Sequence, residues 1–252
     1  MAETSMNTAF PSPSGPVATP AQLENIGALA AALVTPGNRV GLGSGRAALA
    51  FVRALGQRVR TEKLAIVGVA TSLLTEQVAR EAGIPLQTVA EVDALEIAVD
   101  GADEVDPQCN LIKGGGGNLT REKVIENLAK RLIIVVGEEK IVAHLGTNFP
   151  VFLEVIEFAR PAVMRQLAAL GGQVTQRRNA DGSVFLTDNQ NPYLMVRFGP
   201  PPHHLKDPAS LEQTLRHLPG VVETGLFIAM VEEVIVAKFD GTVERQRRHP
   251  TT

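Results

Sequence analysis

The hydrophobic pattern between residues 19 and 147 alternates between two periods. Short apolar runs, typical of buried strands, are followed by segments with apolar residues at helical spacing, several of which end at Gly or Pro. Repeated strand–helix units of this kind predict a parallel sheet with right-handed crossovers. The expected strands are 39–42, 63–69, 85–89, 95–99 and 132–136, and the expected helices are 20–35, 47–55, 73–82 and 120–130.

A second arrangement of elements begins near Phe149. The pattern predicts the order β-α-β-β-α-β, which is that of a ferredoxin-like unit. We therefore expect a disordered leader over 1–18, a larger domain over 19–147 and 229–252, and a smaller domain over 148–228. Within and after the smaller domain, the expected strands are 151–155, 173–177, 184–188, 193–198, 226–230, 234–238 and 240–243, and the expected helices are 162–170 and 208–218.

The stretch from Asp100 to Lys123 carries most of the candidate chemistry. It follows an expected strand, contains four consecutive glycines at 114–117, and enters a helix near Thr120. Ligands of open α/β sheets bind at the carboxyl ends of the strands, which is where Asp100 and its neighbour Asp103 fall. A glycine loop that leads into a helix presents backbone N–H groups to an anion, although glycine runs also serve as flexible linkers. The charged flanks of this loop favour a site over a linker.

Glu122 is the candidate base in this stretch. An acidic residue in the first turn of a helix is also favoured by the helix dipole alone. The dipole would lower the pKa of Glu122, whereas burial in a pocket would raise it, and the pattern does not decide between the two.

A second glycine loop, Gly41 to Arg46, lies between an expected strand and an expected helix. Strand, glycine loop and helix in that order can hold a phosphate at the helix N-terminus. The spacing is not that of a dinucleotide or ATP loop, and an ordinary β–α turn is the alternative. Thr71 and Ser72 stand at a similar junction, where helix capping is the favoured role.

Composition and charge exclude several classes of protein. The 252 residues are 44% hydrophobic, which is enough for a large core. The net charge of −3 does not favour binding to nucleic acid or to an anionic membrane surface. The single cysteine cannot form an internal disulfide, and no Cys/His cluster has the spacing of metal ligands. No apolar run of membrane-spanning length and no export signal is present, so a cytoplasmic location is expected.

The motifs resemble those of the type A ribose-5-phosphate isomerase family. The segments D-G-A-D-E, K-G-G-G and T-R-E-K stand at 100–104, 113–116 and 120–123. L-P-G-V-V-E-T-G-L-F at 218–227 and D-G-T-V at 240–243 also match, so the resemblance covers roughly residues 20–245. It implies a Rossmann-like domain with an inserted smaller α/β domain, assembled as a homodimer or homotetramer.

The resemblance also implies an activity and its residues. The family interconverts D-ribose 5-phosphate and D-ribulose 5-phosphate through a cis-enediolate, without metal or organic cofactor. Mapped by motif, Glu122 carries the proton, Lys113 stabilises the enediolate oxygen, and Asp100 and Asp103 handle hydroxyl protons. The substrate-binding residues on this mapping are Ser44, Gly45, Arg46, Ala47, Gly101, Ala102, Gly114, Gly115, Gly116 and Lys140.

The chain departs from the family pattern at the expected phosphate loop. The family's usual G-T-G-S-T reads G-S-G-R-A here, so Arg46 and Ala47 replace two hydroxyl residues. This leaves open an isomerase for another phosphorylated aldose. A non-catalytic sugar-phosphate sensor is the third possibility, against which the retained Glu122 and the lack of a DNA-binding segment argue.

Overall fold

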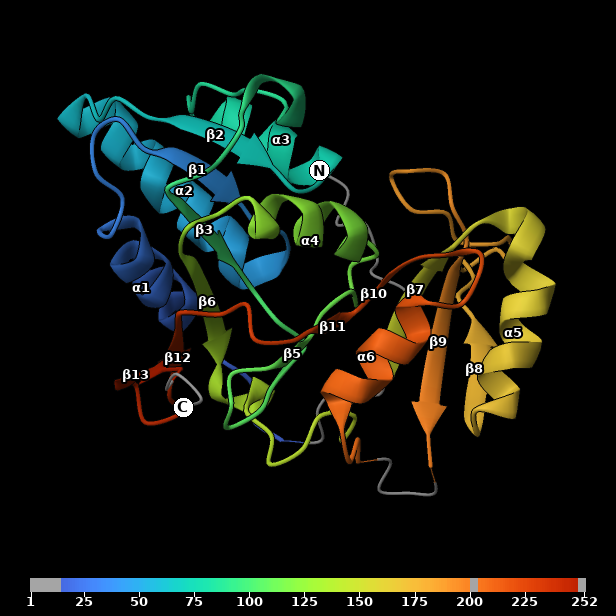
Figure 1. Ribbon diagram of the computed structural model, residues 1–252. Coiled ribbons are helices and arrows are strands. Elements are labelled where there is room, and N and C mark those ends of the chain that lie inside the picture. The colour runs from blue at the N-terminus through green and yellow to red at the C-terminus, as the bar shows by residue number, and fades with distance from the viewer. Residues whose placement is uncertain (1–14, 200–203, 249–252) are drawn as a thin grey trace.

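The computed structural model describes residues 15–199 and 204–248. A six-stranded sheet runs through the larger part of the molecule in the order β13-β12-β6-β3-β1-β2 (Figure 1). All neighbouring strands are parallel except β13, which is antiparallel to β12, so the predicted parallel sheet is confirmed. The strands are β1 (Arg39–Leu42), β2 (Val67–Ala70), β3 (Ile97–Asp100), β6 (Leu132–Gly137), β12 (Glu233–Ala237) and β13 (Val243–Arg247).

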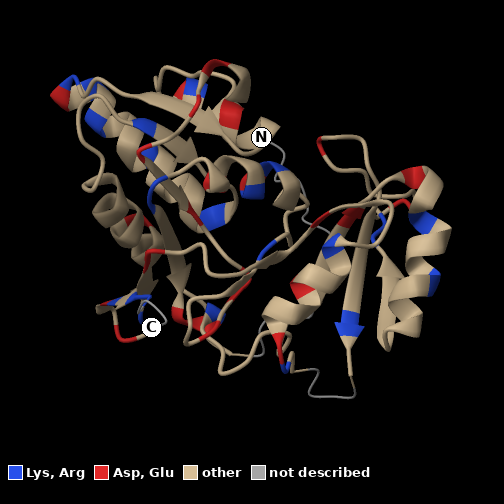
Figure 2. Cartoon of the chain, in the orientation of Figure 1, with Lys and Arg blue, Asp and Glu red and all other residues tan. Residues whose placement is uncertain are grey.

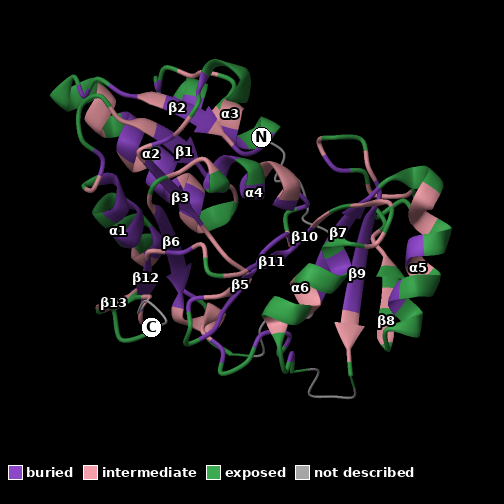
Figure 3. Cartoon of the chain, in the orientation of Figure 1, coloured by how far each residue is buried: buried purple, intermediate pink, exposed green. Residues whose placement is uncertain are grey.

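Both faces of this sheet are covered. In β6, Ile133 and Val135 belong to the core under α1 and α2, whereas Ile134 and Val136 belong to the core on the opposite face. Burial of both faces explains why β6 reads as an uninterrupted apolar run. Figure 3 shows β3 and β6 buried and the outer sides of the helices exposed. The helices of this part are α1 (Pro20–Ala31), α2 (Gly45–Glu62), α3 (Leu73–Glu81) and α4 (Leu119–Asn127).

The inserted unit has its own antiparallel sheet of four strands. Its order, β10-β7-β9-β8, is the ferredoxin-like order expected from the β-α-β-β-α-β pattern. The two helices of the unit connect β7 to β8 and β9 to β10 (Figure 1). The elements are β7 (Val151–Val155), α5 (Arg160–Ala169), β8 (Gly172–Gln176), β9 (Tyr193–Phe198), α6 (Pro208–Arg216) and β10 (Val221–Thr224).

A third, three-stranded sheet joins the two parts. It pairs β4 (Glu104–Val105), β5 (Leu111–Ile112) and β11 (Leu226–Phe227) in the order β11-β5-β4. The chain switches sheets at Gly225, whose N–H donates to Phe152 O and whose carbonyl accepts from Lys113 N–H. One continuous hydrophobic core contains residues of both parts, so the insertion is packed on the sheet. The domain limits 148 and 228 stay a prediction.

Two predicted elements of the larger part were wrong. Residues 85–89 do not form a strand: Leu86 makes one isolated bridge to Gly68, and Thr88 caps a 3-10 turn over Val89–Glu91 instead. The helix predicted over 47–55 continues to Glu62. Gly56 lies inside α2 because a Cβ there would come within 2.5 Å of the Ala82 Cβ, so this glycine permits close packing and does not end the helix.

Three predicted strand positions near the insertion were also wrong. Residues 184–188 make only isolated bridges, and Thr187 in this segment, together with Asn189 just after it, donates to the buried Glu154. The last strand of the small sheet is β10, not 226–230, since Gly225 diverts the chain. The final strand is β13, because 240–242 form the turn before it.

The start of the chain differs in one respect from the expected leader. Residues 1–14 lie outside the described residues, but Ala18 is buried in the core and its N–H donates to Glu139 Oε2. The predicted capping box of Thr19 and Gln22 at the start of α1 is confirmed. In the described part of the chain, no helix is both long and apolar enough to cross a bilayer.

The close crossing of α1 and α2 yields a stability prediction. A Cβ at Gly27 would lie 2.7 Å from Phe51 N and 2.8 Å from Ala50 C, which are backbone atoms that cannot turn aside. In an exposed helix, Gly→Ala stabilises by up to ~1 kcal/mol. Here we expect Gly27→Ala to lower the free energy of unfolding by ~1–3 kcal/mol through overpacking, as measured by denaturant unfolding.

The exposed Asn25 on the same helix provides the control, and Asn25→Ala should leave stability within ~0.5 kcal/mol. A stabilised Gly27→Ala variant would show that the two helices are not in close contact at this point.

Candidate active site

Every predicted site residue lines a single cavity. The cavity has a volume of about 290 Å³ and lies where β1, β3 and β6 end. This is the position at which open α/β sheets bind ligands. The predicted residues that line it are Ser44, Gly45, Arg46, Ala47, Asp100, Gly101, Ala102, Asp103, Lys113, Gly114, Gly115, Gly116, Glu122 and Lys140.

Lys113 is the buried centre of the charges at this cavity. Its ammonium lies 2.8 Å from Asp100 Oδ2, 2.8 Å from Glu126 Oε1 and 3.4 Å from Glu122 Oε2. It also donates to Gly101 O at 2.9 Å. Burial by itself would lower the pKa of Lys113, but the three carboxylates raise it well above its usual range. Lys113 is therefore a fixed positive charge.

Asp100 is held beneath Lys113 by backbone donors. Its Oδ1 accepts from Ser44 N–H at 2.8 Å and from Gly101 N–H at 2.6 Å, and its side chain is 1% exposed. A Cβ on Gly43 would overlap the Asp100 carboxyl group. The glycine at 43 thus makes room for the aspartate.

Glu122 lies in the first turn of α4 and is paired with Lys113. Burial raises the pKa of Glu122 to about 8. The positive charge of Lys113 lowers this pKa, whereas the negative charges of Asp100 and Asp103 raise it further. Burial is the largest of these effects on the pKa of Glu122, and its direction is the one expected of a carboxyl group in a pocket. A carboxylate with a pKa near neutrality is suited to accept and return a proton.

Asp103, in the loop after β3, and Lys140, at the end of a 3-10 helix over Glu138–Lys140, line the same cavity. Asp103 Oδ2 accepts from Gly115 N–H at 2.7 Å. Burial raises the pKa of Asp103, while the charge of Lys140 opposes the shift. The Lys140 ammonium lies 4.6 Å from the ring centre of Phe149.

Side chains of the inserted unit hold the glycine loop. Tyr193, fully buried on β9, donates its hydroxyl to Gly114 O at 2.6 Å, and Arg177 donates to Gly115 O at 3.0 Å. Gly114 has φ +117°, a conformation in which a side chain would be strained. While two carbonyl groups of the loop are held by the insertion, the Gly115 N–H donates to Asp103.

Ser44 is the N-cap residue of α2 in the expected phosphate loop, and its hydroxyl makes no capping hydrogen bond to the helix. Ser44 Oγ lies 2.8 Å from Thr71 Oγ1 and 3.0 Å from Ser72 Oγ, within a group of hydroxyls at the start of α3. Ser72 caps α3, as expected from the sequence. Arg46 is exposed at the cavity, and the described residues provide it with no ion pair or hydrogen bond. The first-turn N–H groups of α2 are those that a helix leaves without internal acceptors.

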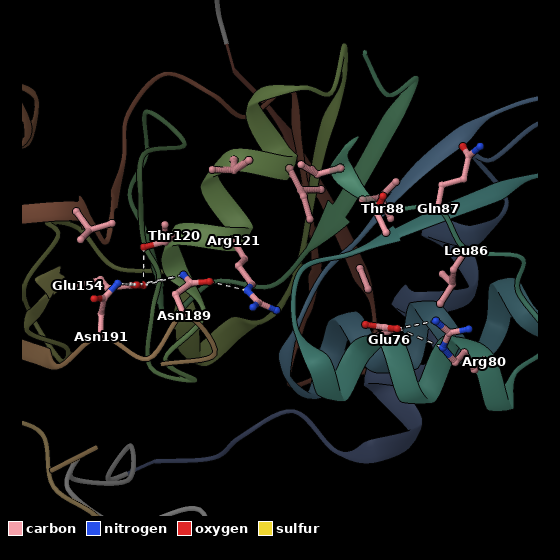
Figure 4. A pocket seen from close by; sticks show the side chains of 16 residues that line it. Glu76, Arg80, Leu86, Gln87, Thr88, Thr120, Arg121, Glu154, Asn189 and Asn191 are labelled. Atoms are coloured by element: carbon pink, nitrogen blue, oxygen red, sulfur yellow. Dashed lines mark hydrogen bonds and ion pairs between the residues drawn. The ribbon is translucent and has the colours of Figure 1, made fainter. Parts of the chain in front are cut away.

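A larger cavity, of about 550 Å³, lies on the other face of α4 (Figure 4). Val124 and Ile125 line it, together with polar side chains such as Arg121 and Asn189, which are hydrogen-bonded to each other. Lys113 and the carboxylates grouped around it do not line this cavity. Figure 2 shows acidic and basic residues interspersed over both parts of the molecule in this view.

Sequence reasoning missed three residues that touch the site. Glu126 is one turn after Glu122 on the same face of α4, so its i, i+4 spacing could have indicated it. Tyr193 lies 79 residues after Gly114, and Arg177 lies 62 residues after Gly115, the glycines whose carbonyl groups they hold. No local signal in the sequence points to them.

The fold and the site define a class of enzyme. A buried carboxylate of raised pKa, next to a fixed ammonium and backbone N–H groups, is suited to moving a proton beside a carbonyl group of a small molecule.

Comparisons with known proteins identify the family. The family model for ribose 5-phosphate isomerase A (phosphoriboisomerase A) matches residues 67–241. The chain is 46% identical over 213 residues to the ribose-5-phosphate isomerase A of Synechococcus sp. (strain JA-3-3Ab), covering 84% of this chain and 91% of that protein. This protein belongs to the ribose 5-phosphate isomerase A family.

Solved structures agree with this assignment. The ribose 5-phosphate isomerase A of Methanocaldococcus jannaschii superimposes with a TM-score of 0.84 and 37% identity, covering 90% of this chain and 98% of that one. A D-ribose-5-phosphate isomerase in complex with phospho-erythronic acid superimposes with a TM-score of 0.86 and 35% identity, covering 93% and 100% of the two chains. The predicted fold class, with a parallel sheet and a separate small domain, is confirmed.

The burial of Tyr193 leads to a spectroscopic prediction. Burial raises the pKa of this phenol well above its usual range, and the charge of Glu122 adds to the shift. Tyr193 is the only tyrosine and the chain has no tryptophan, so phenolate absorbance reports this group alone. We expect no phenolate in the folded protein until it unfolds, whereas the chain in guanidinium should titrate near pH ~10.

The sign of the linked stability change follows. Above pH ~10 the unfolded chain releases the phenolic proton and the folded chain retains it, so the free energy of unfolding should fall as the pH rises. Phenolate appearing near pH ~10 in a protein still folded by circular dichroism would contradict the buried placement.

Proposed function

We propose that this protein interconverts D-ribose 5-phosphate and D-ribulose 5-phosphate through a cis-enediolate. The observation that carries the proposal is the placement of Glu122, with a pKa of about 8, against the fixed charge of Lys113 in a cavity built from the family motifs. The relatives named for this activity align over most of the chain and provide further support. A solved relative binds phospho-erythronic acid, which is also a phosphorylated sugar derivative.

Glu122 moves the proton between C2 and C1 of the substrate. In its ionised form it removes the proton from one carbon, and the resulting acid returns that proton to the other. The negative charge that develops on oxygen is stabilised by the Lys113 ammonium and by N–H groups of the glycine loop. Lys113 is ion-paired with Asp100 and Glu126 and donates a hydrogen bond to Gly101 O, so its positive charge is its main contribution.

Asp103 and Asp100 have different surroundings, which suggests different roles. Asp103 is partly exposed to the cavity and only its Oδ2 is engaged by the loop. We assign it the transfer of hydroxyl protons and ring opening. Asp100 accepts two N–H groups and faces Lys113, so its role is to hold and balance that lysine.

The phosphate is assigned to the N-terminus of α2. The unpaired N–H groups of its first turn and the Arg46 guanidinium supply donors and positive charge, with Lys140 on the opposite side of the cavity. Arg46 thereby supplies hydrogen-bond donors to the phosphate in place of the two hydroxyl groups that the loop lacks. The homodimeric or homotetrameric state and the cytoplasmic location remain part of this proposal, and it includes neither nucleic acid nor membrane as a partner.

The role of Glu122 as the base can be tested by substitution and by pH. Glu122→Gln should lower kcat by at least ~10²-fold while substrate binding stays within about tenfold, because only general-base action is removed. In the wild type, kcat/KM should rise with pH and level off above about 8, since Glu122 is protonated below its pKa and cannot accept a proton.

Coupled spectrophotometric assay of ribulose 5-phosphate formation across pH 5–10 measures both effects. A Glu122→Gln variant with near-normal turnover would remove Glu122 from the role of base. A profile that levels off near pH ~4.5 would show instead that the carboxylate is not desolvated.

The role of Arg46 in phosphate binding can be tested in the same assay. If its guanidinium binds the phosphate, Arg46→Ala should raise KM for ribose 5-phosphate by the equivalent of ~1.5–3 kcal/mol, the range for hydrogen bonds to charged groups. Activity on unphosphorylated ribose should not change. The effect should weaken at high salt, because the contact is exposed.

Arg53 offers a matched control, because it is an exposed arginine on the same helix that does not line the cavity. Arg53→Ala should leave KM unaltered. An unchanged KM in Arg46→Ala at low salt would assign phosphate binding to the α2 N–H groups and Lys140.

A further inference from the structure

Glu126 is a buried carboxylate at the site that the proposed reaction does not use. It lies on α4 one turn after Glu122, is 2% exposed and does not line the cavity. Its Oε1 is 2.8 Å from Lys113 Nζ, as close as Asp100 Oδ2. Glu126 therefore contacts the ammonium from outside the cavity.

The charges around Lys113 do not balance if every group is ionised. Asp100 on β3 and Glu122 and Glu126 on α4 place three carboxylates around a single ammonium, and Asp103 adds a further acid nearby. Isolated buried charge is so costly that such groups take up protons instead. At least one carboxyl group of this cluster must then be neutral.

The unsatisfied oxygens indicate which one. Asp100 Oδ2, Glu126 Oε1 and Glu126 Oε2 are fully buried and have no hydrogen-bond partner among the described residues, although Lys113 is paired with both groups by charge. Two carboxylates cannot hydrogen-bond to each other, because ionised carboxylates only accept. Asp100 Oδ2 and Glu126 Oε1 each lie 2.8 Å from the same Lys113 Nζ, so one proton on Glu126 would supply a donor beside Asp100 Oδ2 and reduce the number of unsatisfied oxygens.

We propose that Glu126 is a positioning residue whose carboxyl group is protonated. It donates a hydrogen bond to Asp100 Oδ2, which keeps Asp100 ionised and Lys113 in place. The pKa of Glu126 is consistent with this protonation. Burial raises it well above its usual range and Asp100 raises it further, although the charge of Lys113 lowers it. Glu122 is then the carboxyl group on α4 that exchanges its proton during turnover. The effect on catalysis rests on the proposed isomerase function, whereas the protonation of Glu126 does not.

Infrared difference spectroscopy tests the proton directly. The carbonyl stretch of a carboxylic acid is separate from the bands of carboxylates, so the wild-type minus E126Q spectrum at pH 7 should contain an acid band. E122Q is the matched control, and its difference spectrum should contain another acid band that disappears from the wild type as the pH rises through about 8. A wild-type minus E126Q spectrum with carboxylate bands and no acid band would overturn the proposal.

Kinetics test what the proton does. The amide of E126Q can still donate to Asp100 Oδ2, whereas E126L cannot, so E126Q should retain a kcat/KM at least about tenfold above that of E126L, from the loss of a hydrogen bond to a charged group. The pH at which kcat/KM levels off should be the same in E126Q and wild type. If Glu126 were ionised, E126Q would remove a negative charge beside Glu122 and move that pH downward, which would contradict the proposal.

The two proposals fail in different ways. If E126L does not fold, the infrared bands and the E126Q profile still decide the role of Glu126. A wild-type protein inactive on ribose 5-phosphate would refute the proposed function, and the infrared result would remain interpretable.

Discussion

The buried ammonium of Lys113 links the three elements on which the site depends. It follows β5, pairs with Asp100 at the end of β3, and pairs with Glu122 and Glu126 on α4. Removing one partner of a buried ion pair leaves an uncompensated charge, which typically costs several kcal/mol. The strand end, the glycine loop and the catalytic helix therefore have one relative placement that satisfies the charges. The same placement desolvates Glu122 and raises its pKa.

The inserted unit supports this arrangement from the other side. Tyr193 and Arg177 hold the carbonyl groups of the glycine loop. Lys123, next to the candidate base, is buried against Glu223 on β10 and donates to Leu226 O. A small domain packed in this way positions the loop and α4 with side chains that never meet the substrate. Their position outside the cavity makes them supporting residues, like those that hold the groups of a preorganised site.

The sequence patterns failed where an interaction between distant segments overrode a local signal. Gly56 has the chemistry of a helix end, yet it lies within α2 because Ala82 of a later segment packs against it. The apolar residues of 184–188 suggest a strand, but this segment makes only isolated bridges, and Thr187 within it, like Asn189 and Asn191 just after it, donates to Glu154.

The sequence by itself determined the alternation of strands and helices, the glycine loops and the residues that gather at the cavity. Each of these depends on local periodicity or on side-chain chemistry within a short motif, as in 100–104 and 120–123. Only the tertiary structure decided that the pKa of Glu122 is raised, that Asp100 is occupied by backbone donors, and that Glu126 joins the cluster at Lys113. Desolvation and Coulomb interactions depend on the distances between groups brought together by folding, and these distances are not encoded in any single stretch of the chain.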